Sequence, residues 1–352
     1  MNSIRVVVVD DSPFNRKVIS EMLESSPRIE VVAKAFDGED AIRKIVQYAP
    51  DAITLDLEMP RMDGFAVLRW LMANRPIPVL VVSARESNRS VFKALDLGAV
   101  DFVVKPSRTA SPKLKELEEE LVSKVLSIPA MQFDKIKDRV SQAPVIPAPA
   151  APLPATQGEH TAAVVAIAAS TGGPPAIQRI VQDLSDEMVS PILICQHMPP
   201  IFTKLFAERL DSLSTRTVKE ASDGEPLQPR HAYVAPGGQQ MQVFHVEGTP
   251  HVSVTGRTAE DRFAPCADHL FLSLARQMED RCLAVVLTGM GDDGKRGALA
   301  VHEKGGRVVA ESEESAVIYG MPKEVVKAGA ADHEVRLDEI PLLIHRYGLV
   351  ES

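Results

Sequence analysis

Three segments of this chain follow apolar runs and carry the side chains that nucleophilic acyl transfer needs. They are AASTGG with Ser170, CQHMPP with His197, and TGMGDDG with Asp292 and Asp293. A hydroxyl, an imidazole and a carboxylate are the nucleophile, the base and the orienting acid of a serine hydrolase. Because ligands bind at the carboxyl ends of parallel strands, we expect the three groups to meet at one edge of a sheet.

Each of these segments also has a simpler interpretation. The Ser170 segment fits a phosphate-binding turn or a helix N-cap, although it lacks the Gly-Lys-Ser/Thr of a P-loop. His197 is one of nine histidines, and it is the best candidate because it ends a strand-like run directly before a loop. The glycines at 289–294 do not follow the GxGxxG order of a dinucleotide site. They suggest instead an oxyanion donor near Met290, beside a carboxylate that orients the imidazole.

A second set of polar residues follows the apolar runs of the first 127 residues. It comprises Asp10, Asp11, Asp56, Ser83 and Lys105. Carboxylates that gather at one edge repel one another, and an all-oxygen cluster suits a hard divalent cation such as Mg²⁺. There, Asp56 is a nucleophile for a phosphoryl group, Lys105 neutralises the acyl phosphate and Ser83 hydrogen-bonds to it. A lone aspartate at a strand end is more often a helix cap, as we expect for Asp37 or Asp63.

Alternating apolar runs and amphipathic segments predict a doubly wound parallel sheet in each half of the chain. The expected strands of the first half are 4–9, 30–35, 52–57, 79–82 and 102–104, with helices beginning near Pro13, Asp37, Asp63, Glu86 and Pro112. Those of the second half include 164–168, 192–195, 231–234, 283–287 and 307–310, with a hairpin from 241–246 and 251–254 joined by 247–250. The Pro/Ala-rich segment 141–154 predicts a semi-rigid linker between the halves.

Composition narrows the possible functions. The chain has 352 residues and 45% hydrophobic residues, enough for two domains with packed cores. A net charge of −9 and only 5% aromatic residues argue against nucleic-acid binding. The three cysteines have no paired spacing, which predicts a reducing compartment and no zinc site. No signal peptide or membrane-spanning stretch is recognisable, so we expect a cytoplasmic protein without membrane insertion.

The first half of the chain resembles the response-regulator receiver domain. The carboxylates, the serine and the Lys-Pro pair at matching strand ends carry this resemblance. It implies that Asp56 is the phosphoacceptor, that Asp10 and Asp11 bind Mg²⁺ with it, and that Ser83 and Lys105 are switch residues. Phe102 lies where that family has its switch aromatic. A histidine kinase is the implied phosphodonor.

The second half looks like the catalytic domain of the chemotaxis protein-glutamate methylesterases. The matching segments are ASTGGP, QHMPP, FAERL, HAYVAPGG, LTGMG and YGMPK. The resemblance implies Ser170 as nucleophile, His197 as general base, Asp293 as the acid behind it and the Met290 amide in the oxyanion hole, with Thr171 supporting the site. It implies no cofactor for the esterase reaction.

One segment departs from the family pattern. The family usually carries Arg directly before Pro-Ser-Val-Asp, whereas this chain has Ala264 before Pro-Cys-Ala-Asp. If that arginine binds an acidic surface of the receptor, substrate preference differs here, and Arg262 is the residue that would substitute for it.

The resemblances predict two α/β domains: a flavodoxin-like receiver at 1–127 and a Rossmann-like methylesterase domain with an antiparallel hairpin at 161–352, separated by a linker at 128–160. The expected function is a phosphorylation-activated methylesterase that removes methyl groups from glutamates on the cytoplasmic helices of chemoreceptors, and that deamidates receptor glutamines. Two alternatives remain: a receiver-gated serine esterase of another substrate, and a non-enzymatic output domain.

Overall fold

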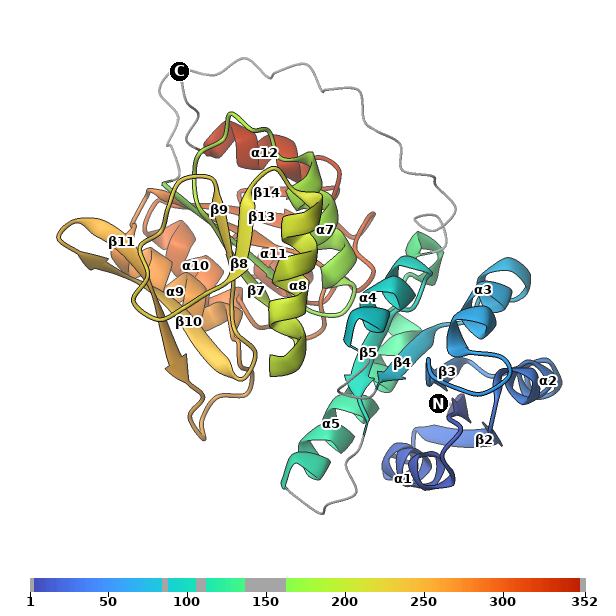
Figure 1. Cartoon of the computed structure of the whole chain (residues 1–352). Helices are drawn as coiled ribbons and strands as arrows, with labels where there is room; N and C mark the ends of the chain where they lie inside the picture. Colours follow the sequence, from blue (N-terminus) through green and yellow to red (C-terminus); the bar gives the residue numbers. More distant parts are fainter. Residues whose placement is uncertain (1–2, 84–87, 106–111, 137–162, 349–352) are drawn as a thin grey trace. The chain divides into compact units, whose positions relative to one another are not determined.

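The computed structural model describes residues 3–83, 88–105, 112–136 and 163–348. The chain divides into two compact units, Met1–Val145 and Ile146–Ser352, and each is described here by itself. Both units are α/β (Figure 1), as the sequence predicted. Among the described residues, no helix is both long and apolar enough to span a membrane.

The first unit is built on a parallel sheet of five strands in the order β2-β1-β3-β4-β5. Its strands are β1 (Ile4–Val9), β2 (Ile29–Ala35), β3 (Ala52–Leu55), β4 (Val79–Ser83) and β5 (Asp101–Val104). Its helices are α1 (Pro13–Glu24), α2 (Gly38–Tyr48), α3 (Gly64–Asn74), α4 (Asn88–Asp96) and α5 (Pro112–Ser127). This order is that of the flavodoxin-like fold, in which the chain reverses direction across the sheet between β1 and β3.

Short polar side chains set where the first helices begin. Ser12 Oγ accepts a hydrogen bond from Asn15 N at the start of α1. Asp37 and Asp63 cap α2 and α3 in the same way, accepting from Asp40 N and Ala66 N. These two aspartates are therefore N-caps, as expected, and lie apart from the carboxylates that gather at the sheet edge.

One core cluster of the first unit lies between the sheet and helices α1 and α5. It includes Val6 and Val8 of β1, Leu23 of α1 and Val125 of α5. The chain continues past residue 127 as a short 3₁₀ turn, Ile128–Ala130, and Ile128 joins the same core. The described part of this unit therefore extends beyond the end of α5.

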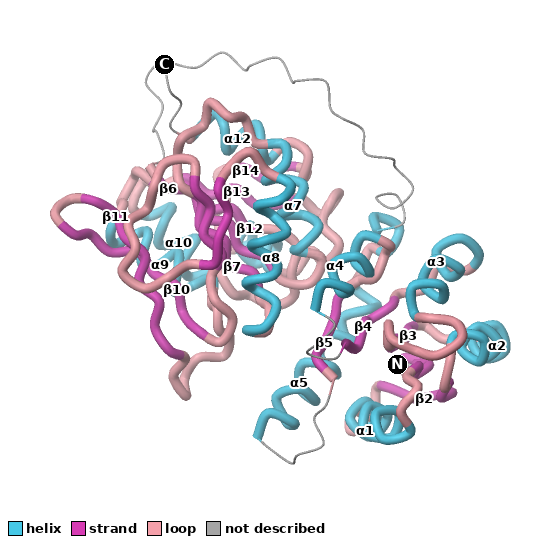
Figure 2. Tube along the Cα trace, viewed as in Figure 1, coloured by secondary structure: helices cyan, strands magenta, loops and turns pink. Residues whose placement is uncertain are grey.

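The second unit holds a parallel sheet of seven strands in the order β14-β13-β12-β6-β7-β9-β8. Its strands are β6 (Val164–Ala169), β7 (Ile192–Gln196), β8 (Thr217–Glu220), β9 (His231–Val234), β12 (Cys282–Val286), β13 (Arg307–Glu311) and β14 (His333–Val335). Its helices are α7 (Gly173–Asp183), α8 (Pro200–Leu213), α9 (Ala267–Gln277), α10 (Lys295–Glu303), α11 (Met321–Lys327) and α12 (Ile340–Tyr347). Helices α9, α10 and α11 contribute to the core cluster that also includes residues of β6 and β12. Figure 2 shows α9 and α10 beside the strands of this sheet.

A separate antiparallel hairpin, β10 (Gln239–Val246) and β11 (Thr249–Gly256), packs against α9. The expected hairpin is confirmed, but its turn is shorter than expected. Glu247 and Gly248 alone make the turn, with φ of 49° and 82°. Positive φ at both central residues is the geometry of a type I′ turn, which suits the twist of a two-residue hairpin.

Two strands had no counterpart among the expected ones. β8 has the sequence TVKE, lies at one edge of the sheet and buries only Val218. β14 has three residues and lies at the other edge. Edge strands are often short and carry charged side chains that discourage pairing with another chain, so their sequences give a weak signal.

Candidate active site and phosphoacceptor site

Ser170 lies where β6 turns into α7, between the ends of two neighbouring strands. Its amide donates to Thr288 O, past the end of β12, at 3.0 Å. Its carbonyl accepts from Gly173 N at 2.8 Å, which closes the turn. Gly172 occupies this turn with φ of 80°, a conformation that favours glycine, and α7 begins at the next residue. The β6–β12 junction is the switch point of the sheet, where α/β folds bind ligands.

His197 follows β7, the strand on the other side of β6. Its amide donates to Ala169 O at 3.0 Å, so the histidine stands beside Ser170 at the same edge. The imidazole Nε2 lies 2.7 Å from Asp293 Oδ2. The ring of Phe263 stacks on the imidazole, with centroids 4.5 Å apart and planes 14° apart. The carboxylate and the aromatic ring together fix the imidazole plane and leave Nδ1 as the nitrogen available for proton transfer.

Asp293 is buried and accepts hydrogen bonds on both oxygens. Besides His197, the amides of Ala267 and Asp268 donate to it at 2.7 and 3.0 Å. The Cys266 thiol and Gly294 N donate at 3.0 Å. Burial by itself would raise the pKa of Asp293, but the hydrogen bond and charge of His197, with the Cys266 thiol and the backbone donors, hold its pKa below the usual range.

The neighbouring acid has a different environment. Asp292 is exposed, and its carboxylate lies 3.5 Å from Arg262, which is also exposed. The Arg262 guanidinium lies over the ring of Phe263, 4.9 Å from the ring centroid. Of the two aspartates in the segment, Asp293 is therefore the one in contact with the imidazole.

Although Asp293 follows α9 in the sequence, its carboxylate lies at the N-terminus of that helix. The N-cap residue of α9, Cys266, makes no side-chain cap, and the Asp293 carboxylate binds the first helical amides in its place. Asp268, in the first turn of α9, accepts in return from Gly297 N of α10 at 2.8 Å. An anion at a helix N-terminus is stabilised by the free amides there, so each helix is capped by a carboxylate from the other's segment.

The Gly289–Met290 backbone lies against the serine. A Cβ at Gly289 would come within 2.9 Å of Ser170 Cβ, so only glycine allows this approach. Within the described part of the chain, the Met290 amide donates to no other group. Thr171 is buried, and its carbonyl accepts from Thr288 Oγ1 at 3.0 Å. An unused amide in backbone that packs against Ser170 suits an oxyanion hole.

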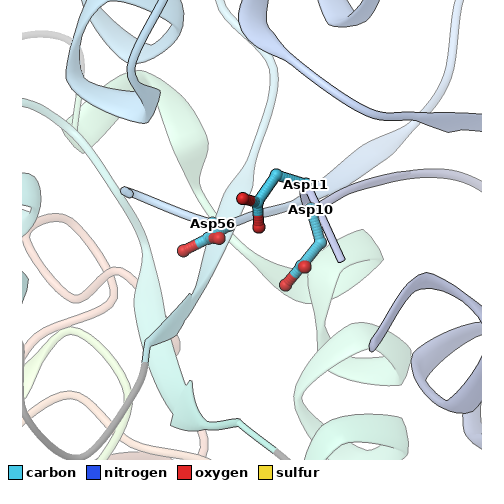
Figure 3. A group of neighbouring side chains, drawn as sticks. All are labelled: Asp10, Asp11 and Asp56. Atoms are coloured by element: carbon cyan, nitrogen blue, oxygen red, sulfur yellow. The ribbon is translucent and has the colours of Figure 1, made fainter. Parts of the chain in front are cut away.

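In the first unit, three carboxylates gather at the β1–β3 switch point (Figure 3). Asp10, Asp11 and Asp56 each offer an oxygen, and these oxygens lie within 4.8 Å of one another. Lys105 Nζ lies 3.1 Å from Asp10 and 2.5 Å from Asp56. Burial raises the pKa of Asp56 to about 6, against the opposing effect of the Lys105 ammonium. The all-oxygen donor set fits a small divalent cation such as Mg²⁺.

The expected switch residues lie next to this cluster. Ser83 is the buried last residue of β4, and its carbonyl accepts from Lys105 N at 2.7 Å. Phe102 is buried in β5, with Lys124 Nζ 5.4 Å from its ring centroid. The structure thus brings Ser83 and Lys105 together beside Asp56, with Phe102 on the adjoining strand.

Four residues around the catalytic edge had no assigned role in the sequence analysis. They are Gln196, Phe263, Cys266 and Asp268. The only sequence signal near three of them was the departure from the family pattern at 262–268. That signal identified the segment but not the carboxylate that it contacts.

Comparison with known proteins agrees with this geometry. The CheB methylesterase family matches residues 165–344, and the response regulator receiver domain matches residues 6–116. A protein-glutamate methylesterase/protein-glutamine glutaminase 1 of Myxococcus xanthus is 44% identical over 337 residues, 96% of this chain and 95% of that protein. A protein-glutamate methylesterase/protein-glutamine glutaminase 3 of Geobacter sulfurreducens is 42% identical over 100% of both chains.

A solved structure matches the second unit. The crystal structure of the Thermotoga maritima CheB methylesterase catalytic domain is 39% identical, with a TM-score of 0.50, and covers 51% of this chain and 96% of that one. Fold and comparisons together define a response regulator joined to a carboxylic ester hydrolase. The chain belongs to the protein-glutamate methylesterase/protein-glutamine glutaminase family.

Proposed function

We propose that this protein hydrolyses glutamate methyl esters and glutamine amides on chemoreceptor helices through Ser170, His197 and Asp293, and that phosphorylation of Asp56 regulates it. The observation that carries the first part is the 2.7 Å contact between His197 Nε2 and Asp293 Oδ2, at the switch point where Ser170 lies. Names of relatives supply the substrate class, because they act on protein glutamate and glutamine side chains.

The first half-reaction forms an acyl-enzyme. Ser170 Oγ attacks the side-chain carbonyl carbon and transfers its proton to His197 Nδ1. The Met290 amide binds the oxyanion, and Asp293 stabilises the imidazolium through Nε2–H. When the tetrahedral intermediate collapses, His197 returns the proton to the leaving group, so methanol leaves from an ester and ammonia from an amide.

The second half-reaction releases glutamate. Water gives a proton to His197 Nδ1 and attacks the acyl carbon, and the same amide binds the oxyanion. Collapse breaks the bond to Ser170 Oγ, which regains the proton from His197. Each proton therefore passes through one nitrogen, and Asp293 remains ionised throughout because its pKa is held low.

Phosphorylation uses the carboxylate cluster of the first unit. Asp10, Asp11 and Asp56 would hold Mg²⁺, which screens the charge of the incoming phosphoryl group. Asp56 Oδ attacks phosphorus of a phosphohistidine on a kinase, the P–N bond breaks, and the kinase imidazole leaves and takes a proton from solvent. Lys105 then pairs with the acyl phosphate in place of the free carboxylate. The added charge, about −1.5 to −2, changes what Ser83 and Lys105 contact.

The test is methanol release from membranes that hold methylated receptors, with and without acetyl phosphate and Mg²⁺. We expect release to rise with the phosphodonor, and Asp56→Asn to remove that rise while keeping the basal rate. Hydrolysis of small esters without methanol release from receptors would favour a receiver-linked esterase of another substrate. No hydrolysis of any ester would favour a non-enzymatic output.

A further inference from the structure

We propose that Gln196 is a positioning residue that fixes the spacing between Ser170 and His197. Gln196 is the last residue of β7 and is buried, with 2% of its surface exposed. Its Nε2 donates to the carbonyl oxygen of Ser170 at 2.9 Å and to that of His197 at 3.0 Å. One side-chain amide therefore joins the backbones of the two residues that exchange a proton. The inference rests on the roles proposed above for Ser170 and His197.

This link lies where strand pairing ends. The last residue pair of the β6–β7 ladder is Ala169 with Gln196, and the last backbone hydrogen bond runs from His197 N to Ala169 O. Beyond it, Ser170 turns into α7 while His197 continues toward α8. The Gln196 amide supplies one further connection between these two segments of the chain, beyond the end of the β6–β7 ladder.

The surroundings of Gln196 are shaped to hold this conformation. A Cβ at Gly173 would overlap Gln196 Oε1, so the glycine at the start of α7 leaves room for the amide. Oε1 is buried and accepts no hydrogen bond from the part of the chain that the structure describes. An unpartnered buried acceptor is unfavourable. The two donated bonds are therefore the polar contacts that hold the side chain in this conformation.

The functional consequence follows from the geometry of proton transfer. Attack by Ser170 Oγ requires His197 Nδ1 within hydrogen-bond reach, and a displacement of about 1 Å in such a site lowers the rate about 10²-fold. Gln196 is buried and bonds to backbone carbonyls, so it offers almost no surface to a substrate. Its loss should therefore lower kcat and leave substrate affinity nearly unchanged.

The experiment compares Gln196→Met with Gln178→Met in the full-length enzyme, activated by acetyl phosphate and Mg²⁺. Methionine keeps the volume of glutamine and removes both donors. Gln178 is a matched control, because it lies on α7 and accepts from Arg209 Nε at 2.9 Å, away from the strand ends. Methanol release from methylated receptor membranes gives kcat and KM. Labelling of Ser170 by a fluorophosphonate gives the reactivity of the nucleophile without any receptor.

For Gln196→Met we expect kcat and the labelling rate to fall together by about 10- to 100-fold, with KM within about two-fold. Gln178→Met should match the wild type in all three. The proposal is overturned if folded Gln196→Met labels at the wild-type rate, or if only KM changes. If Gln196→Met does not fold, Gln196→Asn serves instead, since its amide is one methylene too short to make both bonds.

A comparison with the Ser170→Ala variant distinguishes failure of this inference from failure of the proposed function. Methanol release by Ser170→Ala would overturn the proposed mechanism itself. Loss of release in Ser170→Ala, with full labelling and release in Gln196→Met, would overturn only the role of Gln196.

Discussion

His197 presents Nε2 to Asp293, at 2.7 Å from Oδ2. In the chymotrypsin triad the aspartate binds Nδ1 and the base acts through Nε2. In the proposed mechanism the imidazole is therefore used in the opposite sense. Nδ1 is the ring nitrogen nearer the main chain, so the serine must approach the imidazole from the backbone side. Ser170 is placed for such an approach because it directly follows β6, the strand that pairs with the β7 strand before His197.

Replacing Ser170 with Ala should reduce methanol release by about 10⁶-fold, because no other group in the site is placed to attack the carbonyl. The fold should be unaffected, since the turn at Ser170 is held by its backbone. Ser212→Ala is the matched control: its hydroxyl is bonded on α8 to Arg209 O, and activity should be unchanged. Turnover near the wild-type rate in folded Ser170→Ala would contradict the mechanism.

Asp293→Asn should lower kcat by about 10⁴-fold, because an amide neither stabilises the imidazolium nor accepts at every position that the carboxylate uses. Asp292→Asn removes only an exposed pair with Arg262 and should change kcat by less than about two-fold. Steady-state kinetics on both variants provides the check. The reverse ranking would mean that Asp292 is the acid behind the imidazole.

Cys266→Ala should lower kcat about 10-fold, since it removes one donor to the catalytic carboxylate, and hydrogen bonds to charged groups contribute about 1.5–3 kcal/mol. Burial and the charge of Asp293 raise the pKa of the Cys266 thiol to about 12, so it stays protonated and donates at neutral pH. Cys266→Ser keeps a donor and should remain close to wild type. Equal losses in the Ser and Ala variants would show that the thiol matters for its volume alone.

Asp56→Asn should stabilise the metal-free first unit at neutral pH and not in acid. The pKa of Asp56 is raised to about 6 in the folded state, so the folded state binds the proton more tightly than the unfolded chain does. Stability is therefore lost as pH rises from about 4 to about 6, and a rise of this size corresponds to about 3 kcal/mol. The advantage of Asn should be full above pH 6.

The measurement is urea unfolding without Mg²⁺ between pH 4.5 and 8, followed by tryptophan fluorescence. Trp70 is the only tryptophan of the chain and lies on α3, so it reports on the first unit alone. Glu39→Gln, which removes an exposed carboxylate on α2, is the matched control variant. A stability difference for Asp56→Asn that stays constant across this range would disprove the argument.

The sequence was sufficient for the elements that position both sites. Apolar β-branched runs with a polar residue at their carboxyl end located β1, β3, β6, β7 and β12, and the parallel-sheet rule then placed Asp10 beside Asp56 and Ser170 beside His197. The hairpin was recognisable because two strand-like runs, 241–246 and 251–254, are joined by a short segment that contains Gly248. Short edge strands such as β8 were not, because their residues are largely polar.

The sequence could not supply the surroundings of Asp293. Its donors come from Cys266, Ala267 and Asp268, 25 to 27 residues earlier in the chain. That contact depends on how α9 packs against α10, which no local pattern encodes. The orientation of the His197 ring depends on Phe263 and Asp293 together, so it too follows only from the packed structure.

The Asp293 carboxylate, just before α10, caps α9, and the Asp268 carboxylate of α9 caps α10. This reciprocal capping determines which inactive variant is suitable for capturing receptors. A variant at Asp293 would leave the first amides of α9 without their acceptor, so its failure to hold a receptor would report on folding as well as on chemistry. The hydroxyl of Ser170 bonds to no other group in the described residues. Ser170→Ala is therefore the substrate trap of choice, since it keeps the docking surface while stopping the reaction before the ester bond breaks.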